Sequence, residues 1–163
     1  MNTRNAVIAS GLAQEGIELI RNIRDNNMLF ALSDLSIDPE VAFRGGGLPQ
    51  VLNAEGCKID VGYDYVQDRP SLDCAAGDLN EIFFDAETET FSHDDTETQT
   101  IFRRESDIEY RFETINGEIN QLSGMDVTSW VWWDGNANHP IAADDCNLAH
   151  RCIMVEDYLP KRD

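Results

Sequence analysis

The sequence predicts an α+β domain in which one long N-terminal helix packs against one face of an antiparallel sheet. Three observations lead to this prediction. Apolar residues recur at helical spacing between Ala9 and Asn27, several later segments alternate apolar and polar residues as strands do, and no second helical pattern of comparable strength follows. With 163 residues, the chain is expected to form a single domain whose core needs neither a metal nor a cofactor.

The helix is predicted from about Asn5 to Arg24, and the polar run Asp25–Asn27 is expected to end it. At about 100° per residue, one face collects the apolar and small residues Ala9, Leu12, Ala13, Gly16, Ile20 and Ile23. The opposite face carries mainly Gln14, Glu18, Arg21 and Asp25. Leu12, Ile20 and Ile23 supply most of the apolar area and are predicted to hold the helix on the sheet. An ordinary surface helix is the alternative.

The remainder of the chain is predicted to be a loop followed by a meander of strands. Residues 34–50 contain two prolines and a triplet of glycines, which are typical of a loop. Asn116-Gly117 suits a type I′ turn, because both central residues of that turn need positive φ. The expected strands are Lys58–Val66, Leu79–Phe84, Thr88–Ser92, Thr98–Thr114, Val127–Trp133 and Cys152–Leu159.

The run LAQEGIELIRNIRDNN, Leu12–Asn27, resembles the segment that follows the hydrophobic N-terminal helix in type IV pilin-like and pseudopilin subunits. Thr100–Arg104, and Val127–Trp133 followed by Val155–Leu159, are similar to the same bacterial subgroup. The resemblance implies a pilin-like fold with about four or more strands. Residues 1–27 would then be the C-terminal half of the long helix, 28–56 the helix-to-sheet loop, and 57–163 a sheet with disulfide-bounded loops.

This resemblance implies a structural subunit of an extracellular type IV pilus-like filament, or fimbrium, rather than an enzyme. The subunit would be anchored in the inner membrane before assembly, through a hydrophobic segment that is missing here. Its partners would be other pilin subunits, which the helix face near Glu15, Glu18 and Arg21 would contact. The alternative is an extracellular calcium- or glycan-binding module that does not polymerise.

The charge of the chain argues against nucleic acid as a partner. The formal net charge is −19, and Lys58 and Lys161 are the two lysines. Binding to phosphates needs clustered basic residues, which this chain lacks. Acidic residues are spread along the whole sequence, as expected for a well-solvated surface.

Four cysteines suggest two disulfides and therefore an exported protein. Local pairing, Cys57 with Cys74 and Cys146 with Cys152, is the simplest of the three possible connectivities. The sequence shows neither a signal peptide nor a long apolar run, so a chain that begins after a membrane-spanning segment is expected. The competing interpretation of the second pair is a zinc site of Cys146, His150 and Cys152, with His139 as a further ligand.

Calcium is a further metal for which the sequence offers a candidate site. Asp134, Asn136, Asn138 and Asp145 follow the oxygen-ligand spacing of a calcium loop, although His139 stands where the sharp turn needs glycine. A polar hairpin loop is the favoured interpretation of this segment. No catalytic motif is recognisable, and the three histidines all fall in predicted loops. Trp130, Trp132 and Trp133 are expected either in the core or as an aromatic ligand platform.

Overall fold

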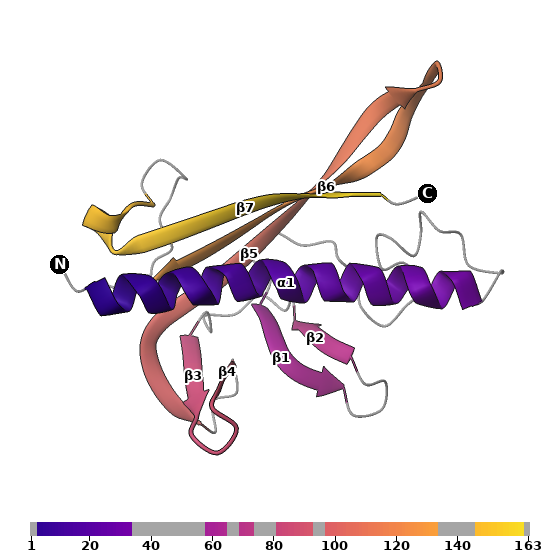
Figure 1. Ribbon diagram of the computed structural model, residues 1–163. Helices are drawn as coiled ribbons and strands as arrows, with labels where there is room; N and C mark the ends of the chain where they lie inside the picture. Colours follow the sequence, from indigo (N-terminus) through magenta and orange to yellow (C-terminus); the bar gives the residue numbers. More distant parts are fainter. Residues whose placement is uncertain are drawn as a thin grey trace.

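The computed structural model describes residues 3–33, 58–64, 69–73, 81–92, 97–133 and 146–161. One long helix, α1 (Thr3–Ser33), packs on a five-stranded antiparallel sheet, which confirms the predicted α+β class (Figure 1). The strands follow the order β4-β3-β5-β6-β7, with bounds β3 Glu81–Asp85, β4 Thr90–Ser92, β5 Thr98–Ile115, β6 Glu118–Trp132 and β7 Cys152–Pro160. A separate antiparallel pair consists of β1 (Lys58–Asp64) and β2 (Arg69–Asp73).

The helix buries the face that the sequence predicted. Ala9, Leu12, Ala13, Gly16, Ile20 and Ile23 are all buried. The predicted end of the helix was wrong, because α1 continues through Asp25–Asn27 to Ser33. Asn27 is buried and Met28 packs against the core, so contacts with the rest of the protein extend the helix beyond a polar run of poor intrinsic propensity.

The strand predictions agree well with the sheet. Every predicted strand has a counterpart in the structure, but the predicted start of Val127–Trp133 was wrong, because β6 begins at Glu118 and pairs with β5 from there onward. Asn116 and Gly117 have φ values of 54° and 88°, as the type I′ turn requires. β6 lies between β5 and β7, and Val127–Trp133 is buried on both sides except at Thr128. β2 was not predicted. It contains Pro70, which strands tolerate at sheet edges, and β2 pairs with β1 alone.

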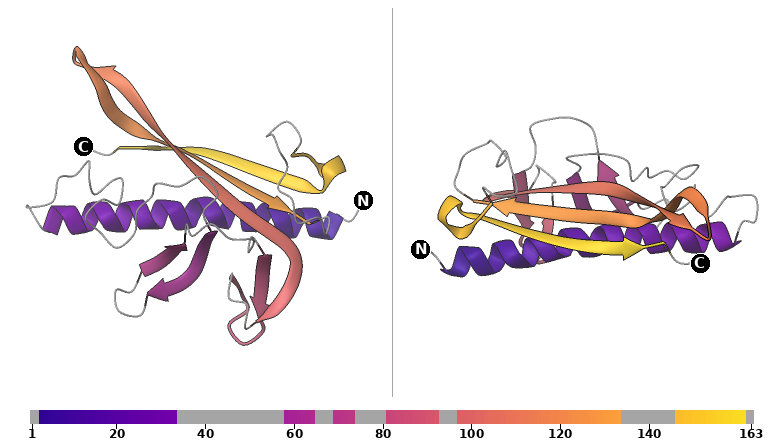
Figure 2. Two further views of the ribbon diagram at one scale, coloured as in Figure 1. Left: turned by 180° about the vertical axis from the view of Figure 1, so that it is seen from behind. Right: turned by 90° about the horizontal axis from the view of Figure 1, so that it is seen from above.

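The core between helix and sheet consists of two apolar clusters. In the views of Figure 2, α1 runs along the sheet beside β5, β6 and β7. The first cluster surrounds Ile20 and Ile23 of the helix, together with Val127 and Leu159 of the sheet. The second surrounds Ala9, Leu12 and Ala13, with Ile82, Phe102, Val131 and Trp133 on the sheet. Leu12, Ile20 and Ile23 therefore lie where the sequence placed them, against the sheet.

Candidate interaction surfaces

The helix lies tightly against the sheet at Gly16, between the two apolar clusters. A Cβ atom added there would lie 2.5 Å from Ser129 Oγ and 3.2 Å from Ser106 Oγ. These two serines are fully buried and face each other across β5 and β6, with 3.3 Å between their hydroxyl oxygens. Gly16 thus permits a backbone approach that any side chain would obstruct.

A buried arginine completes this polar layer. Arg104 is 1% exposed, and its Nη1 donates to the Leu12 carbonyl oxygen at 3.2 Å and to Glu15 Oε2 at 2.9 Å. The guanidinium therefore donates to a helix carbonyl and pairs with a helix carboxylate at once. The sequence carried a signal for this contact that our prediction missed. Arg104 alternates with Phe102, Ser106 and Ile108 on the inward face of β5.

The three residues predicted to contact neighbouring subunits occupy different environments. Glu15 is partly exposed and holds Arg104, as described above. Arg21 forms ion pairs with Glu18 on the helix and with Asp157 on β7, each with an N–O distance of 2.5 Å. The hydrogen bond with Glu18 raises the pKa of Arg21, and the hydrogen bond with Asp157 raises it by a smaller amount. Glu18 is the most exposed of the three. Glu15 and Arg21, through Arg104 and Asp157, also hold the helix on its own sheet.

One face of α1 is exposed along nearly its whole length. The exposed positions recur every three or four residues, which places them in one stripe on the side away from the sheet. At Gly11 an added Cβ would meet nothing within 4 Å. We call this surface the exposed helix stripe: Thr3, Arg4, Val7, Ser10, Gly11, Gln14, Glu18, Asn22 and Leu29.

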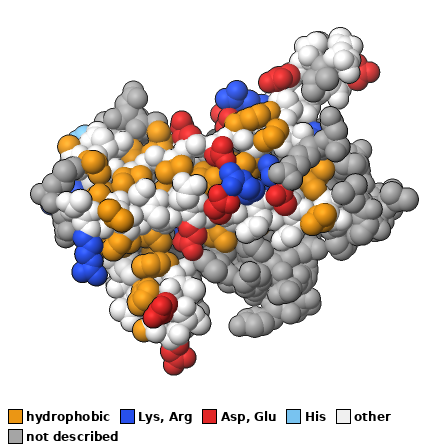
Figure 3. All heavy atoms as spheres, viewed as in Figure 1, with side chains coloured by type: hydrophobic (Ala, Val, Ile, Leu, Met, Phe, Trp, Pro, Cys, Tyr) orange, Lys and Arg blue, Asp and Glu red, His pale blue; other side chains and the backbone are white. Residues whose placement is uncertain are grey.

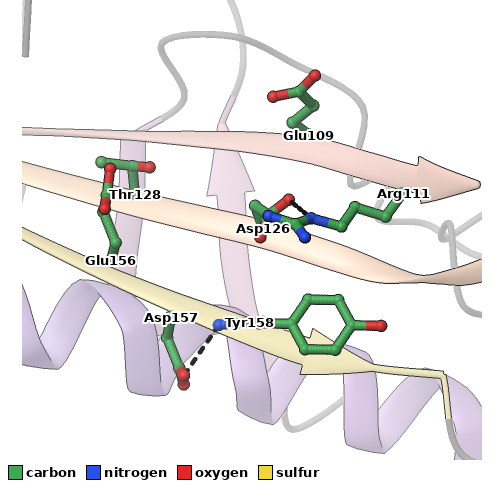
Figure 4. Close-up of a pocket in the computed structure, with 7 residues that line it drawn as sticks. All are labelled: Glu109, Arg111, Asp126, Thr128, Glu156, Asp157 and Tyr158. Carbon is green, nitrogen blue, oxygen red and sulfur yellow. Dashed lines mark hydrogen bonds and ion pairs between the residues drawn. The ribbon is translucent and has the colours of Figure 1, made fainter.

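The outer face of the sheet carries a charged hollow of about 440 Å³ (Figure 4). Arg111 of β5 pairs with Asp126 of β6, and its guanidinium carbon lies 5.5 Å from the ring centre of Tyr158 on β7. The hydrogen bond with Asp126 raises the pKa of Arg111. Carboxylates dominate the lining, which consists of Glu109, Arg111, Asp126, Thr128, Glu156, Asp157 and Tyr158.

Tyr158 fastens the end of β7 to β6. Its ring lies on Gly124, where an added Cβ would come within 2.6 Å of the ring. The Tyr158 hydroxyl donates to the Ser123 carbonyl oxygen at 3.0 Å, and the Lys161 N–H donates to the same oxygen at 2.8 Å. Ser123 lies at a register shift between β5 and β6. Arg111, Asp126 and Tyr158 of the hollow therefore link β5, β6 and β7 at this point.

A disulfide joins Cys146 and Cys152, as predicted, and encloses a short 3-10 helix. The Asn147 side chain accepts from the N–H groups of Ala149 and His150, and Arg151 adopts the left-handed conformation that closes the loop. Because both sulfurs are bonded to each other, the alternative zinc site using Cys146, His150 and Cys152 was wrong. Trp130 and Trp132 pack against Cys152 and are buried, as is Trp133 on the other face.

Several predicted features fall outside the described residues. They are the loop at 34–50, Cys57 and Cys74, and the proposed calcium ligands Asp134, Asn136, Asn138 and Asp145. In the part of the chain that the structure covers, no cluster of three or more histidine, cysteine or acidic side chains is arranged to hold a metal ion. No helix in that part combines the length and the apolar character needed to cross a membrane.

Comparisons with family models, with curated proteins and with solved structures return no match to this chain. The functional argument therefore depends on the sequence motif and on the geometry described above.

Proposed function

We propose that the chain is the headgroup of a structural subunit in a type IV pilus-like extracellular filament. The observation that carries the proposal is the division of α1 into two faces. The sheet buries one face from Ala9 to Ile23, while the exposed helix stripe runs from Thr3 to Leu29. A helix that is anchored on one side and open on the other is suited to pack against neighbouring copies.

The described surfaces also favour a structural role over a catalytic one. In the outer hollow Arg111 pairs with Asp126, and Tyr158 fastens β7 to β6. The polar layer of Arg104, Ser106 and Ser129 lies in the helix-to-sheet contact, where it sets the position of the helix. These polar groups hold elements together, which is what a filament subunit requires of its headgroup.

Immunogold electron microscopy of cells that produce the full natural chain tests the proposal. Antibodies against the chain should label surface filaments along their length. Replacing Gln14, on the exposed helix stripe, by arginine should reduce the number of labelled filaments without lowering the melting temperature of the soluble chain. Glu87→Arg, an exposed change on the turn between β3 and β4, is the matched control and should leave filaments unchanged. Surface filaments without label would contradict the proposal.

A calcium- or glycan-binding module that does not polymerise remains the alternative proposal. Calcium titration separates the two, because an ion that binds only the native state raises the melting temperature by mass action. An increase of several degrees at millimolar calcium would favour the alternative, and Asp134→Asn should then abolish the increase.

A further inference from the structure

The β5–β6 hairpin extends past the rest of the sheet as an arm. Pairing of β6 with β7 ends at Gly124 and Pro160, whereas β5 and β6 continue together to Ile115 and Glu118. Figure 1 shows this arm, residues 112–121, projecting beyond the body of the protein. Two strands alone are marginally stable in water, so a projecting ribbon gains stability when another surface covers it.

The arm presents an apolar side chain among carboxylates. Phe112 is 46% exposed, and Glu113 and Glu118 are exposed beside it along the ribbon. Acidic side chains are visible near the projecting tip in Figure 3. An exposed aromatic ring on a ribbon that carries charged side chains is typical of a small interaction surface, in which the ring supplies buried area and the charges supply orientation.

The opposite end of the molecule has the complementary character. We call it the basic end: the first turns of α1, residues 3–9, and the disulfide loop, residues 146–152. Trp133 joins the two segments, because it packs in the cluster of Ala9 and its N–H donates to the Arg151 carbonyl oxygen at 3.1 Å. The exposed apolar side chains of this end are Val7, 67% exposed, and Leu148, 45% exposed. Arg4 and Arg151 are its exposed charged side chains.

We infer that the arm of one copy docks on the basic end of a second copy of this chain. Apolar Phe112 would meet Val7 and Leu148, and the carboxylates of the arm would face Arg4 and Arg151. The inference rests on the proposed function, since it assigns one contact between successive subunits. The two surfaces lie at opposite ends of the molecule in Figures 1 and 2. Such a contact is heterologous and propagates into an open chain of copies instead of closing a dimer.

The contact is small, so by itself it is weak and reversible in solution. Photocrosslinking captures it. Phe112 is replaced by p-benzoylphenylalanine in the soluble chain. This variant is mixed with isotope-labelled wild-type protein at about 1 mM, because weak contacts form at such a concentration. After irradiation, mass spectrometry should find crosslinks from position 112 to residues 3–9 or 146–152 of the labelled copy. The same photoreactive residue at Leu29, which is 65% exposed on α1, is the control and should not reach these segments.

Exchange of charges between the two surfaces is the second part of the experiment. In the photoreactive chain, Glu113→Lys with Glu118→Lys should lower the crosslink yield to wild type by about tenfold, because like charges then face each other. A labelled partner carrying Arg4→Glu and Arg151→Glu should restore the yield.

Absence of crosslinks to the basic end, or failure of the exchanged pair to recover, overturns the inference. Immunogold labelling of filaments has a separate readout. Labelled filaments without the crosslink would reject this contact and leave the proposed function intact.

Discussion

Replacing Gly16 by alanine measures how tightly the helix lies on the sheet. The new Cβ would stand 2.5 Å from Ser129 Oγ, well inside contact distance, and 3.3 Å from Arg104 Cδ. Ser129 is fully buried and faces Ser106, so it has little room to turn away. Overpacking of this kind costs about 1–3 kcal/mol, and the better helix propensity of alanine returns at most about 1 kcal/mol. We expect a net loss of roughly 1–2 kcal/mol in the free energy of unfolding.

Gly11→Ala is the matched control. It lies in the same helix, five residues earlier by number, with nothing within 4 Å of the added atom. Because glycine is a poor helix former, alanine there should stabilise the protein by about 0.5–1 kcal/mol. Urea denaturation of the two variants gives both free energies, and the melting temperature should shift by about 2–4 °C per kcal/mol in opposite directions.

A double-mutant cycle identifies the cause of the loss at Gly16. Ser129→Ala removes the oxygen that the new Cβ meets, so Gly16→Ala should cost less in that background than in the wild type. The expected coupling is about 0.5–1 kcal/mol. A Gly16→Ala variant as stable as Gly11→Ala would refute the close approach of α1 to the sheet that the whole packing argument uses.

Three further variants test other contacts. Glu15→Ala removes the carboxylate that pairs with buried Arg104 and should cost about 2–3 kcal/mol by urea denaturation. This is less than for a fully buried pair, because Glu15 is partly exposed, and Glu15→Gln should cost less. Thr88→Ala should raise the pKa of Asp85, which the hydrogen bond from Thr88 lowers; an unchanged NMR titration would contradict this. The stabilisation from Asp85 is present above its unfolded pKa and disappears as the pH falls through the lowered value. Replacing Cys146 and Cys152 together by alanine should lower the free energy of unfolding by about 2 kcal/mol, measured against wild type.

Local spacing predicted the elements whose signal is carried by consecutive residues. The apolar stripe from Ala9 to Ile23 defines one helix face regardless of what lies opposite. Asn116-Gly117 fixes a tight turn because its backbone conformation is a local property. The short loop closed by Cys146 and Cys152 was predicted for the same reason, since neighbouring cysteines need little chain to meet.

The same local reasoning failed where distant residues decide the outcome. It ended the helix at Arg24, yet packing of Asn27 and Met28 carries it to Ser33. It gave no role to Arg104, because a charged residue in a strand is ordinarily exposed. Contacts with the distant helix, among them those with the Leu12 carbonyl and Glu15, favour its burial.

The amino-acid sequence by itself determined the α+β class, the buried stripe of α1, the turn of the β5–β6 hairpin and the local disulfide, since each depends on residues close together in the chain. Only the tertiary structure decided that Gly16 lies against Ser106 and Ser129, that Arg104 is buried under the helix, and that the hairpin extends beyond β7 as an arm. The physical reason is that burial and exposure depend on which surface lies opposite a residue, and this is settled when the helix docks on the sheet.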